Sequence, residues 1–502
     1  MGLWFLYRLE PESAAYNLAF TARVRSDLDV AVLEQAVQML VTRHPTLRTV
    51  YGQDTGEPFQ EIHAAQTSYQ LLEQIDATGW DEERLVQSAI AAYQRPFNLE
   101  TGPIVRLTIL TRSPQDHVLL LTIHHIAVDG VSFGILLTEL QQLYKAQQTG
   151  ESLKFEAIDA AYPEFVQWQR DLVKSESGET LWTYWQQQLT GVQTLDLPTD
   201  HTYTPSQSQQ GASYSFEISP ALTQQLRSLA RAHGATLYTT LLTVFQVLLY
   251  RYTGQTDIVV GTPASGRGQP QFARTVGFFV NMIALRGNLA GNPTFAALLE
   301  QVRQTVLAAL AHQAYPAPVL VERLGLNRDL SQPSLFRSAF NVLNLPKLAG
   351  DFELSVSNQI GARAQWGNLV LEPFEIPQQE GQNDLVFDIM ETSDRLIGSF
   401  RYSCDLFESR TIHAMAARFQ ALLAGIVANP DRTIAQLPFL SLADQQQLSA
   451  WASPTAPYPT GLAVHQLIEQ QTARTPDAIA IVCPQLAENL DISYQELAYQ
   501  QL

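Results

Sequence analysis

The sequence predicts an α/β protein whose chain builds two lobes of similar size, one after the other. Strand-like apolar runs alternate with helical spacing in the first part of the chain, and the same alternation begins again near Ser213. The chain has 502 residues, more than one hydrophobic core usually serves. We therefore expect a first lobe over residues 1–177 and a second lobe over residues 181–441.

The elements of the first lobe are predicted from the spacing of its apolar residues. Leu33, Val37 and Leu40 recur at the spacing that places side chains on one face of a helix. Two short apolar runs have the length of buried strands. The elements expected here are a helix over 27–44, strands over 104–110 and 118–123, and a helix that begins at Ser132 and ends before Gly150.

The second lobe repeats the pattern, with glycine and proline marking where its elements begin and end. Gly234 and Gly254 follow two helical segments, where glycine commonly ends a helix, and Pro293 opens a third. Pro430 stops the last one. The elements expected here are helices over 220–233, 236–252, 293–311 and 411–428, strands over 257–262, 277–285 and 336–343, and a hairpin of 384–389 with 396–402.

Composition narrows the possible partners and locations. A net charge of -18 and a pI near 5.0, with no basic cluster, argue against nucleic acid as a partner. Cys404 and Cys483 lie far apart, so neither a disulfide framework nor a zinc site is indicated, and a reducing cytoplasm is the expected location. No uninterrupted apolar run reaches the roughly 18 residues of a membrane span, so no membrane partner is expected.

The C-terminal part is predicted to be a linker followed by a fragment. Residues 442–461 are assigned to a proline-rich linker, because three prolines fall between Ser453 and Gly461. Residues 462–502 have room for one helix and two strands at most. That is too little chain to bury a core of its own.

The segment His124-His125-Ile126-Ala127-Val128-Asp129-Gly130 is the centre of the predicted site. It lies between an expected strand and an expected helix, so two imidazoles emerge where a buried strand ends. Successive side chains of an extended chain point to opposite sides, so only one of the two histidines can face a given cleft. Adjacent histidines rarely bind one ion, and no third ligand is suitably spaced, so no metal is expected.

Several motifs, in order, resemble those of the condensation domains of non-ribosomal peptide synthetases. The central segment fits the family's HHxxxDG in full, and residues 43–49 are similar to its RHxxLRT. The usual first residues of the opening motif are missing, so the chain is expected to begin inside the domain. Further motifs in the family's order lie at 3–17, 162–168, 276–286, 312–316 and 328–336, and residues 474–478 and 492–497 resemble the start of an adenylation domain.

The resemblance implies both a fold and an activity. The fold is two chloramphenicol-acetyltransferase-like lobes in a V-shaped pseudo-dimer with a central tunnel. The activity is peptide-bond formation, in which the amine of an acceptor aminoacyl thioester attacks a donor acyl or peptidyl thioester. Upstream donor and downstream acceptor peptidyl carrier proteins would deliver both on phosphopantetheine arms, so the chain itself is expected to hold no cofactor. Its own adenylation domain would be a further partner in the full-length enzyme.

The resemblance also suggests roles for the residues of the site. His125 is the expected catalytic residue, either as a general base or as a hydrogen-bonding partner of the developing ammonium. His124 is expected to be structural, and Asp129 to hold the loop through an ion pair with Arg43. Ser132 is expected to cap the following helix or to donate to the oxyanion.

Gly130 is expected to give the backbone freedom and to let substrate approach closely.

Departures from the family pattern and other functions also bear on this interpretation. Val131 replaces a tryptophan frequent in relatives, and residues 316–318 replace Pro-Phe-Glu, which would reshape the channel. The opening is similar to that of domains taking an L-configured donor. Heterocyclisation and epimerisation domains are disfavoured by the intact histidine pair and by the adenylation-like segment. Two alternatives stay open, a catalytically silent member that recruits partner proteins and a free-standing acyltransferase that uses coenzyme A.

Overall fold

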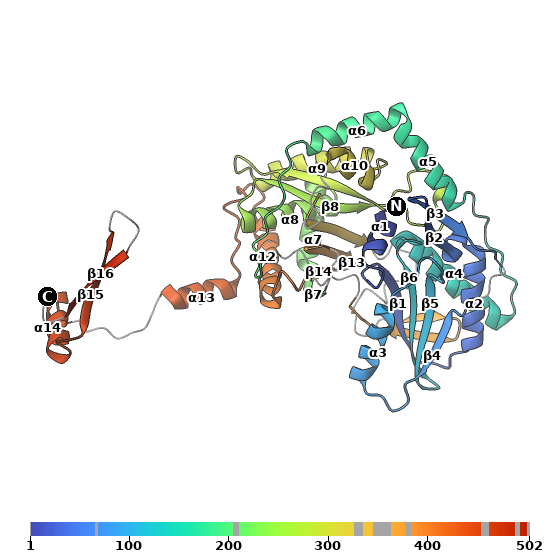
Figure 1. The fold of residues 1–502 in the computed structure, drawn as a ribbon, viewed down its shortest axis with the longest axis horizontal. Coiled ribbons are helices and arrows are strands. Elements are labelled where there is room, and N and C mark those ends of the chain that lie inside the picture. Colours follow the sequence, from blue (N-terminus) through green and yellow to red (C-terminus); the bar gives the residue numbers. More distant parts are fainter. Residues whose placement is uncertain are drawn as a thin grey trace. The chain divides into compact units, whose positions relative to one another are not determined.

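The computed structural model describes residues 2–65, 69–203, 210–325, 335–344, 363–377, 383–392, 394–452, 461–486 and 492–498. Two compact units are present, Met1–Ser441 and Leu442–Leu502. Within the described part of the first unit, two six-stranded sheets each carry packed helices (Figure 1). The predicted division into two α/β lobes is therefore confirmed.

The first half of the chain alternates helices and strands more often than the sequence pattern predicts. The predicted strands and helices are all present, with bounds shifted by a few residues. In chain order the elements are α1 (Gly2–Leu9), β1 (Asn17–Val24), α2 (Val30–Arg43), β2 (Thr49–Asp54), β3 (Glu57–Ile62), β4 (Leu72–Asp76), α3 (Glu82–Gln94), β5 (Val105–Ser113), β6 (Asp116–His124), α4 (Gly130–Thr149), α5 (Tyr162–Lys174) and α6 (Glu176–Leu189).

The second half contains the elements of the other sheet and two strands that join the first. The predicted strand over 277–285 begins later than expected, at Asn281, because the preceding residues form a loop at the site. In chain order the elements are β7 (Gly211–Ile218), α7 (Pro220–Ala232), α8 (Leu237–Thr253), β8 (Asp257–Ala264), β9 (Asn281–Asn288), α9 (Phe295–Ala311), α10 (Ala317–Leu324), β10 (Ser338–Asn344), β11 (Ala364–Trp366), β12 (Leu369–Pro373), β13 (Leu385–Glu391), β14 (Leu396–Ser403) and α12 (Ser409–Ala428).

The sheet of the first lobe is covered by helices on both faces. Its strand order is β11-β12-β1-β6-β5-β4. Leu119 and Leu121 of β6 pack with α2 and α4, whereas Val118 and Leu120 pack with α3 (Figure 1). This alternation is the two-residue period of a strand buried on both sides. The strand that leads to the site is therefore held firmly from both faces.

Residues 364–373 lie in the first lobe, so their predicted assignment to the second lobe is wrong. β12 pairs antiparallel with β1, and β11 extends the same sheet. Trp366 is fully buried there, with its ring stacked on Phe20 at 5.4 Å between centroids. Burial of this large apolar side chain is the physical reason that the segment crosses over.

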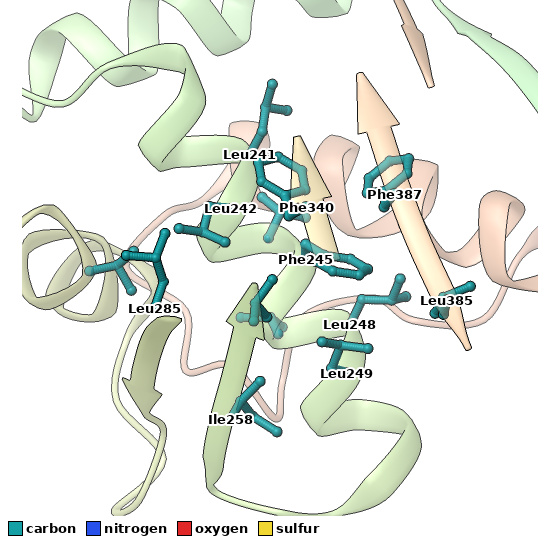
Figure 2. Packing of buried hydrophobic residues seen from close by; sticks show 14 of the residues in the cluster. Leu241, Leu242, Phe245, Leu248, Leu249, Ile258, Leu285, Phe340, Leu385 and Phe387 are labelled. Carbon is teal, nitrogen blue, oxygen red and sulfur yellow. The ribbon is translucent and has the colours of Figure 1, made fainter. Parts of the chain in front are cut away.

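The core of the second lobe forms around α8. The sheet has the order β7-β14-β13-β10-β8-β9, in which β10 runs parallel to both of its neighbours. Every residue from Thr239 to Leu249 on α8 is buried. Phe245 of this helix stacks on Phe340 of the sheet, with 5.6 Å between ring centroids (Figure 2). A helix that is apolar all round is expected at the centre of a large core.

Helix α12 of the second lobe is apolar along most of its length. Among the described residues, it is by itself long and apolar enough to cross a membrane. Its Ile412, Phe419 and Leu423 are fully buried in the core of the second lobe. This packing is that of a core helix.

The second unit contains little structure. It comprises α13 (Leu442–Ala452), α14 (Val464–Arg474) and a hairpin of β15 (Ile479–Leu486) with β16 (Ile492–Ala498). The one helix and two strands after residue 461 agree with the prediction. Within the predicted linker over 442–461, residues 442–452 are helical, and residues 453–460 lie outside the described part of the chain. No residue of α13 or α14 is buried.

We expect Trp366→Ala to lower the free energy of unfolding by about 3–5 kcal/mol, because it empties a fully buried site in the first lobe. Denaturant unfolding followed by circular dichroism measures the change. Trp451→Ala is the matched control, since Trp451 is 69% exposed on α13, and its effect should stay below about 0.5 kcal/mol. Equal losses in the two variants would show that the crossing segment does not stabilise the lobe.

Candidate active site

The predicted centre lies where β6 gives way to α4. β6 ends at His124, and a turn over 125–127 leads to Asp129, the N-cap of α4. Asp129 Oδ1 accepts a hydrogen bond from the Ser132 amide at 2.7 Å, which satisfies a backbone donor at the start of the helix. Asp129 therefore caps the helix, and the prediction that Ser132 does so is wrong. Gly130 is the exposed first residue of α4.

His124 is packed inside the first lobe. It is 4% exposed, and its ring meets Phe97 edge-on at 6.3 Å between centroids. Its Nδ1 accepts a hydrogen bond from the Ile126 amide at 3.1 Å. Burial, with a smaller contribution from the neighbouring His125, lowers the pKa of His124 to about 3. The ring is neutral at cellular pH, and its own proton is on Nε2.

His125 has the opposite tautomer. Its Nδ1 lies 2.6 Å from the Val128 carbonyl oxygen, which can only accept, so Nδ1 carries the proton. Burial is the main cause that lowers its pKa, and the positive charge of Arg401 adds to it, against the opposing effects of Val128 and Asp129. The imidazole is thus neutral at cellular pH with Nε2 as its acceptor.

The position of the His125 ring is defined on several sides. Its backbone amide donates to the Tyr16 carbonyl at 2.8 Å. Its ring meets Phe278 of the second lobe edge-on at 5.2 Å between centroids. The residue remains partly exposed, unlike His124. The site therefore combines a first-lobe histidine with a wall supplied by the second lobe.

Asp129 pairs with Arg267, so the predicted ion pair with Arg43 is wrong. Arg267 Nη2 lies 3.2 Å from Asp129 Oδ1, and both side chains are less than 10% exposed, at 7% and 4%. The guanidinium also donates to the carbonyls of Phe272 and Thr275 and stacks over the Phe279 ring at 4.0 Å. A buried carboxylate is thereby matched by a cation from the other lobe.

Arg43 pairs instead with Glu139 of α4, at 3.0 Å from Nε to Oε2. His44 binds the same carboxylate at 2.7 Å. Burial alone would raise the pKa of Glu139, but the hydrogen bonds and charges of His44 and Arg43 lower it. Glu139 lies about 15 Å along the helix from Asp129, which explains why Arg43 does not reach the loop.

Ser132 joins the two lobes. Its hydroxyl donates to the Gly277 carbonyl at 2.7 Å and accepts from the Gly277 amide at 3.0 Å and from Arg267 at 2.7 Å. The hydroxyl proton is committed to Gly277, so the alternative role of Ser132 as an oxyanion donor is also wrong. Gly277 itself cannot carry a side chain, because an added Cβ would meet the Tyr162 ring.

Arg267 is the site residue that the sequence pattern did not reveal. It stands between Gly266 and Gly268, and that glycine scatter carries no phosphate-binding motif. Gly266 has φ +66°, and an added Cβ would overlap the Phe279 carbonyl. A glycine that is forced into close backbone contact beside an arginine is the signal that could have pointed to this loop.

The arrangement suits proton handling by one imidazole. A neutral ring with a fixed Nδ1 proton can accept a proton or a hydrogen bond at Nε2. Within the described residues no group of three or more His, Cys, Asp or Glu side chains could hold a metal ion. The imidazole and the charged side chains around it can supply acid–base and electrostatic chemistry.

The comparisons with known proteins agree with one another. A family model described as "Condensation domain" matches residues 1–449. A linear gramicidin synthase from Brevibacillus parabrevis is 37% identical over 490 residues, which cover 96% of this chain and 6% of that protein. The chain thus spans only 6–9% of the length of the first curated relatives it matches.

Solved structures match the fold over most of the chain. A four-domain nonribosomal peptide synthetase bound to AMP and glycine has a TM-score of 0.84 at 25% identity, covering 100% of this chain and 37% of that one. The X-domain from teicoplanin biosynthesis, solved in complex with OxyB, has a TM-score of 0.76 at 25% identity, covering 87% of this chain and 94% of that one. The predicted chloramphenicol-acetyltransferase-like fold is confirmed, and the tunnel stays a prediction.

We expect both histidines to titrate below the ordinary histidine pKa of about 6.5. The unfolded chain would bind protons that the folded chain excludes as pH falls below that value, so stability should decrease with acidification in this window. Imidazole ¹⁵N NMR of the native chain, assigned with single-histidine variants, measures both pKa values and the two tautomers. A pKa of His125 at or above 6.5, or a proton on its Nε2, would contradict the assignment.

A pair of double-mutant cycles tests which arginine pairs with Asp129. Asp129→Asn keeps a good N-cap but removes the charge. With Arg267→Met, the free energies of unfolding should be coupled by about 1–3 kcal/mol. With Arg43→Met, the matched control, the two changes should add within about 0.5 kcal/mol. Coupling to Arg43 alone would show that Arg43, and not Arg267, is the partner of this carboxylate.

Proposed function

The chain belongs to the condensation-domain family, and we propose that it joins a donor acyl or peptidyl thioester to the amine of an acceptor aminoacyl thioester. The acceptor nitrogen attacks the donor carbonyl, a C–N bond forms, and the C–S bond breaks. The nitrogen loses one proton and the leaving sulfur gains one. The thioester is already activated, so the protein has to bring the two ends together and manage charge.

The observation that carries the proposal is the 2.6 Å contact between His125 Nδ1 and the Val128 carbonyl oxygen. Because Nδ1 donates to the Val128 carbonyl, Nε2 can take the proton of the attacking nitrogen or accept a hydrogen bond from the developing ammonium. An α-amino group has a pKa of about 7.7–8.0, so a weak base is sufficient for this step. His125 is the catalytic residue in this proposal.

The other site residues act as positioning residues. Arg267 and Ser132 hold the start of α4 against the second lobe, and Asp129 receives a hydrogen bond from the Phe279 amide at 3.0 Å. His124 keeps the end of β6 packed and neutral. Gly130 leaves the approach to the turn open, since no atom of the described residues lies within 4 Å of where a Cβ would stand. These contacts fix the turn that carries the imidazole.

We also propose that both substrates arrive on phosphopantetheine arms of separate carrier proteins, within a cytoplasmic pathway for non-ribosomal peptides or hybrid polyketides. The similarity to gramicidin synthase supports this pathway. Residues 462–502 are proposed to be the start of an adenylation domain. The match of the whole chain to a four-domain synthetase supports that assignment.

A catalytically silent role in recruiting a partner protein is the second candidate. It is favoured by one structural neighbour, an X-domain solved in complex with OxyB. The neutral imidazole favours catalysis over this alternative, because no described residue occupies its acceptor nitrogen Nε2. An activity measurement that depends on His125 separates the two.

We expect His125→Ala to lower amide formation by at least about 100-fold, because general acid–base groups commonly contribute that much. The assay uses one carrier protein loaded with alanyl-phosphopantetheine and a second loaded with leucyl-phosphopantetheine, and the dipeptidyl product is quantified by mass spectrometry. Alanyl coenzyme A, offered in place of the loaded donor carrier, should react more slowly.

His413→Ala is the matched control, because His413 is an exposed histidine on α12 and the variant should keep the native rate. Equal product from the native chain and His125→Ala would remove the catalytic assignment. A faster reaction with the coenzyme A donor would favour a free-standing acyltransferase instead.

A further inference from the structure

The sheet of the second lobe is interrupted between β8 and β10. These neighbouring strands are paired at a single position, Ala339 with Gly261. By contrast, β8 pairs with β9 over all eight of its residues, and β10 pairs with β13 over all seven. Pro263 follows two residues after Gly261, and proline has no N–H to donate to a ladder. The two strands are therefore free to separate beyond this point.

A pocket of about 230 Å³ lies at the separation. Thr262 and Val342 belong to the faces of their strands that pack on the core, because Val260 and Phe340 have the same parity. Pro263 and Asn341 belong to the opposite face, yet they line the same pocket. The pocket therefore passes through the sheet from one face to the other.

The inside of the pocket is apolar. Ile283 and Leu285 of β9 and Val306 of α9 form its wall within the core. The nearby hydroxyl of Tyr238 donates to Thr262 Oγ1 at 2.8 Å, so these two polar groups satisfy each other. Leu310 is 42% exposed, so the pocket reaches the surface at the α9 end. Such a lining favours hydrocarbon over charged groups.

The end of the pocket lined by Pro263 and Asn341, its mouth, lies on the face of the sheet that carries Asp388 and Arg401. Asn341 is directly opposite Asp388 in the neighbouring strand. Asp388 binds Arg401 at 2.6 Å, and Arg401 is the cation whose charge reaches His125. The row from Asn341 to Arg401 thus runs from the mouth of the pocket towards the imidazole of His125.

The chain path gives a second, independent connection. Ala264, the residue after Pro263, pairs with Asn281 at the start of β9. Asn281 follows three residues after Phe278, whose ring contacts that of His125. Consecutive Cα atoms are 3.8 Å apart, so the pocket and the histidine wall are separated by at most roughly 20 Å. This path sets an upper limit on the length that a chain attached to a thioester at His125 would need to enter the mouth.

We propose that this gap in the sheet is a binding pocket for the apolar side chain or acyl chain of a thioester substrate. The inference rests on the proposed function and specifies the substrate class, a hydrocarbon group with its carbonyl held at His125. Each buried methylene group favours binding by about 0.8 kcal/mol, roughly a fourfold preference. The pocket would thereby select substrates by the length of their apolar part.

A binding measurement tests the pocket without requiring turnover. Octanoyl-pantetheine and acetyl-pantetheine are titrated against the native chain by calorimetry. We expect the octanoyl compound to bind at least about tenfold more tightly, and Leu310→Trp to remove most of that difference by filling the pocket. Leu307→Trp is the matched control, because Leu307 is 57% exposed on the same helix and does not line the pocket.

We expect Val306→Phe also to remove most of the difference in affinity between octanoyl-pantetheine and acetyl-pantetheine, because the larger side chain fills the pocket from within. Equal affinities for the two compounds in the native chain, or equal effects of Leu310→Trp and Leu307→Trp, would overturn the proposal. Both results stand whether or not amide formation is observed. Failure of the proposed function, in contrast, would appear as absent or His125-independent product.

Two competition experiments show whether the pocket binds the side chain of the donor or that of the acceptor. In the donor arm, leucyl and alanyl donors compete for a glycyl acceptor, and in the acceptor arm, leucyl and alanyl acceptors compete for a glycyl donor. We expect Leu310→Trp to reduce the preference for leucine about tenfold in one arm and leave the other unchanged. No change in either arm would contradict a substrate role for the pocket.

Discussion

One buried guanidinium holds the site together. Arg267 Nη2 reaches from the second lobe to Asp129 and Ser132 at the start of α4. Its Nη1 donates hydrogen bonds to two carbonyls of its own loop. A buried carboxylate without a cation would be strongly unfavourable, so the loop before α4 depends on the second lobe for its conformation. The turn that carries His125 immediately precedes this contact. The geometry of the imidazole is therefore a property of both lobes.

The same arrangement explains how two adjacent histidines differ. Each ring makes one hydrogen bond to nearby backbone, but the Ile126 amide donates to His124 and the Val128 carbonyl accepts from His125. Burial keeps both rings neutral, so one backbone contact is enough to decide each tautomer. The acceptor nitrogen of His124 is therefore occupied, whereas no described residue occupies Nε2 of His125.

The second half of the chain also supplies two strands to the sheet of the first lobe. After β10 the backbone leaves the second sheet, contributes β11 and β12 to the first, and returns as β13. The buried Trp366 anchors this excursion. β10 and β13 then pair in parallel over their full length, while β10 meets β8 at one position only. The pocket beside Pro263 is thus a consequence of how the central strand is shared between its neighbours.

The sequence alone predicted many of the elements, and its family motifs singled out His125 as the candidate catalytic residue. Apolar spacing was sufficient for α2, α4, α8 and the strands beside the site, because periodicity reports which face of an element is buried. Apolar spacing could not show which residues or strands that are distant in the chain would pair with one another. The family resemblance suggested Arg43 as the cation for Asp129, but the fold places Arg43 at Glu139 and brings Arg267 to Asp129 from a glycine-flanked loop across the lobes. Crossing strands and ion pairs depend on long-range contacts, and local residue patterns carry no record of them.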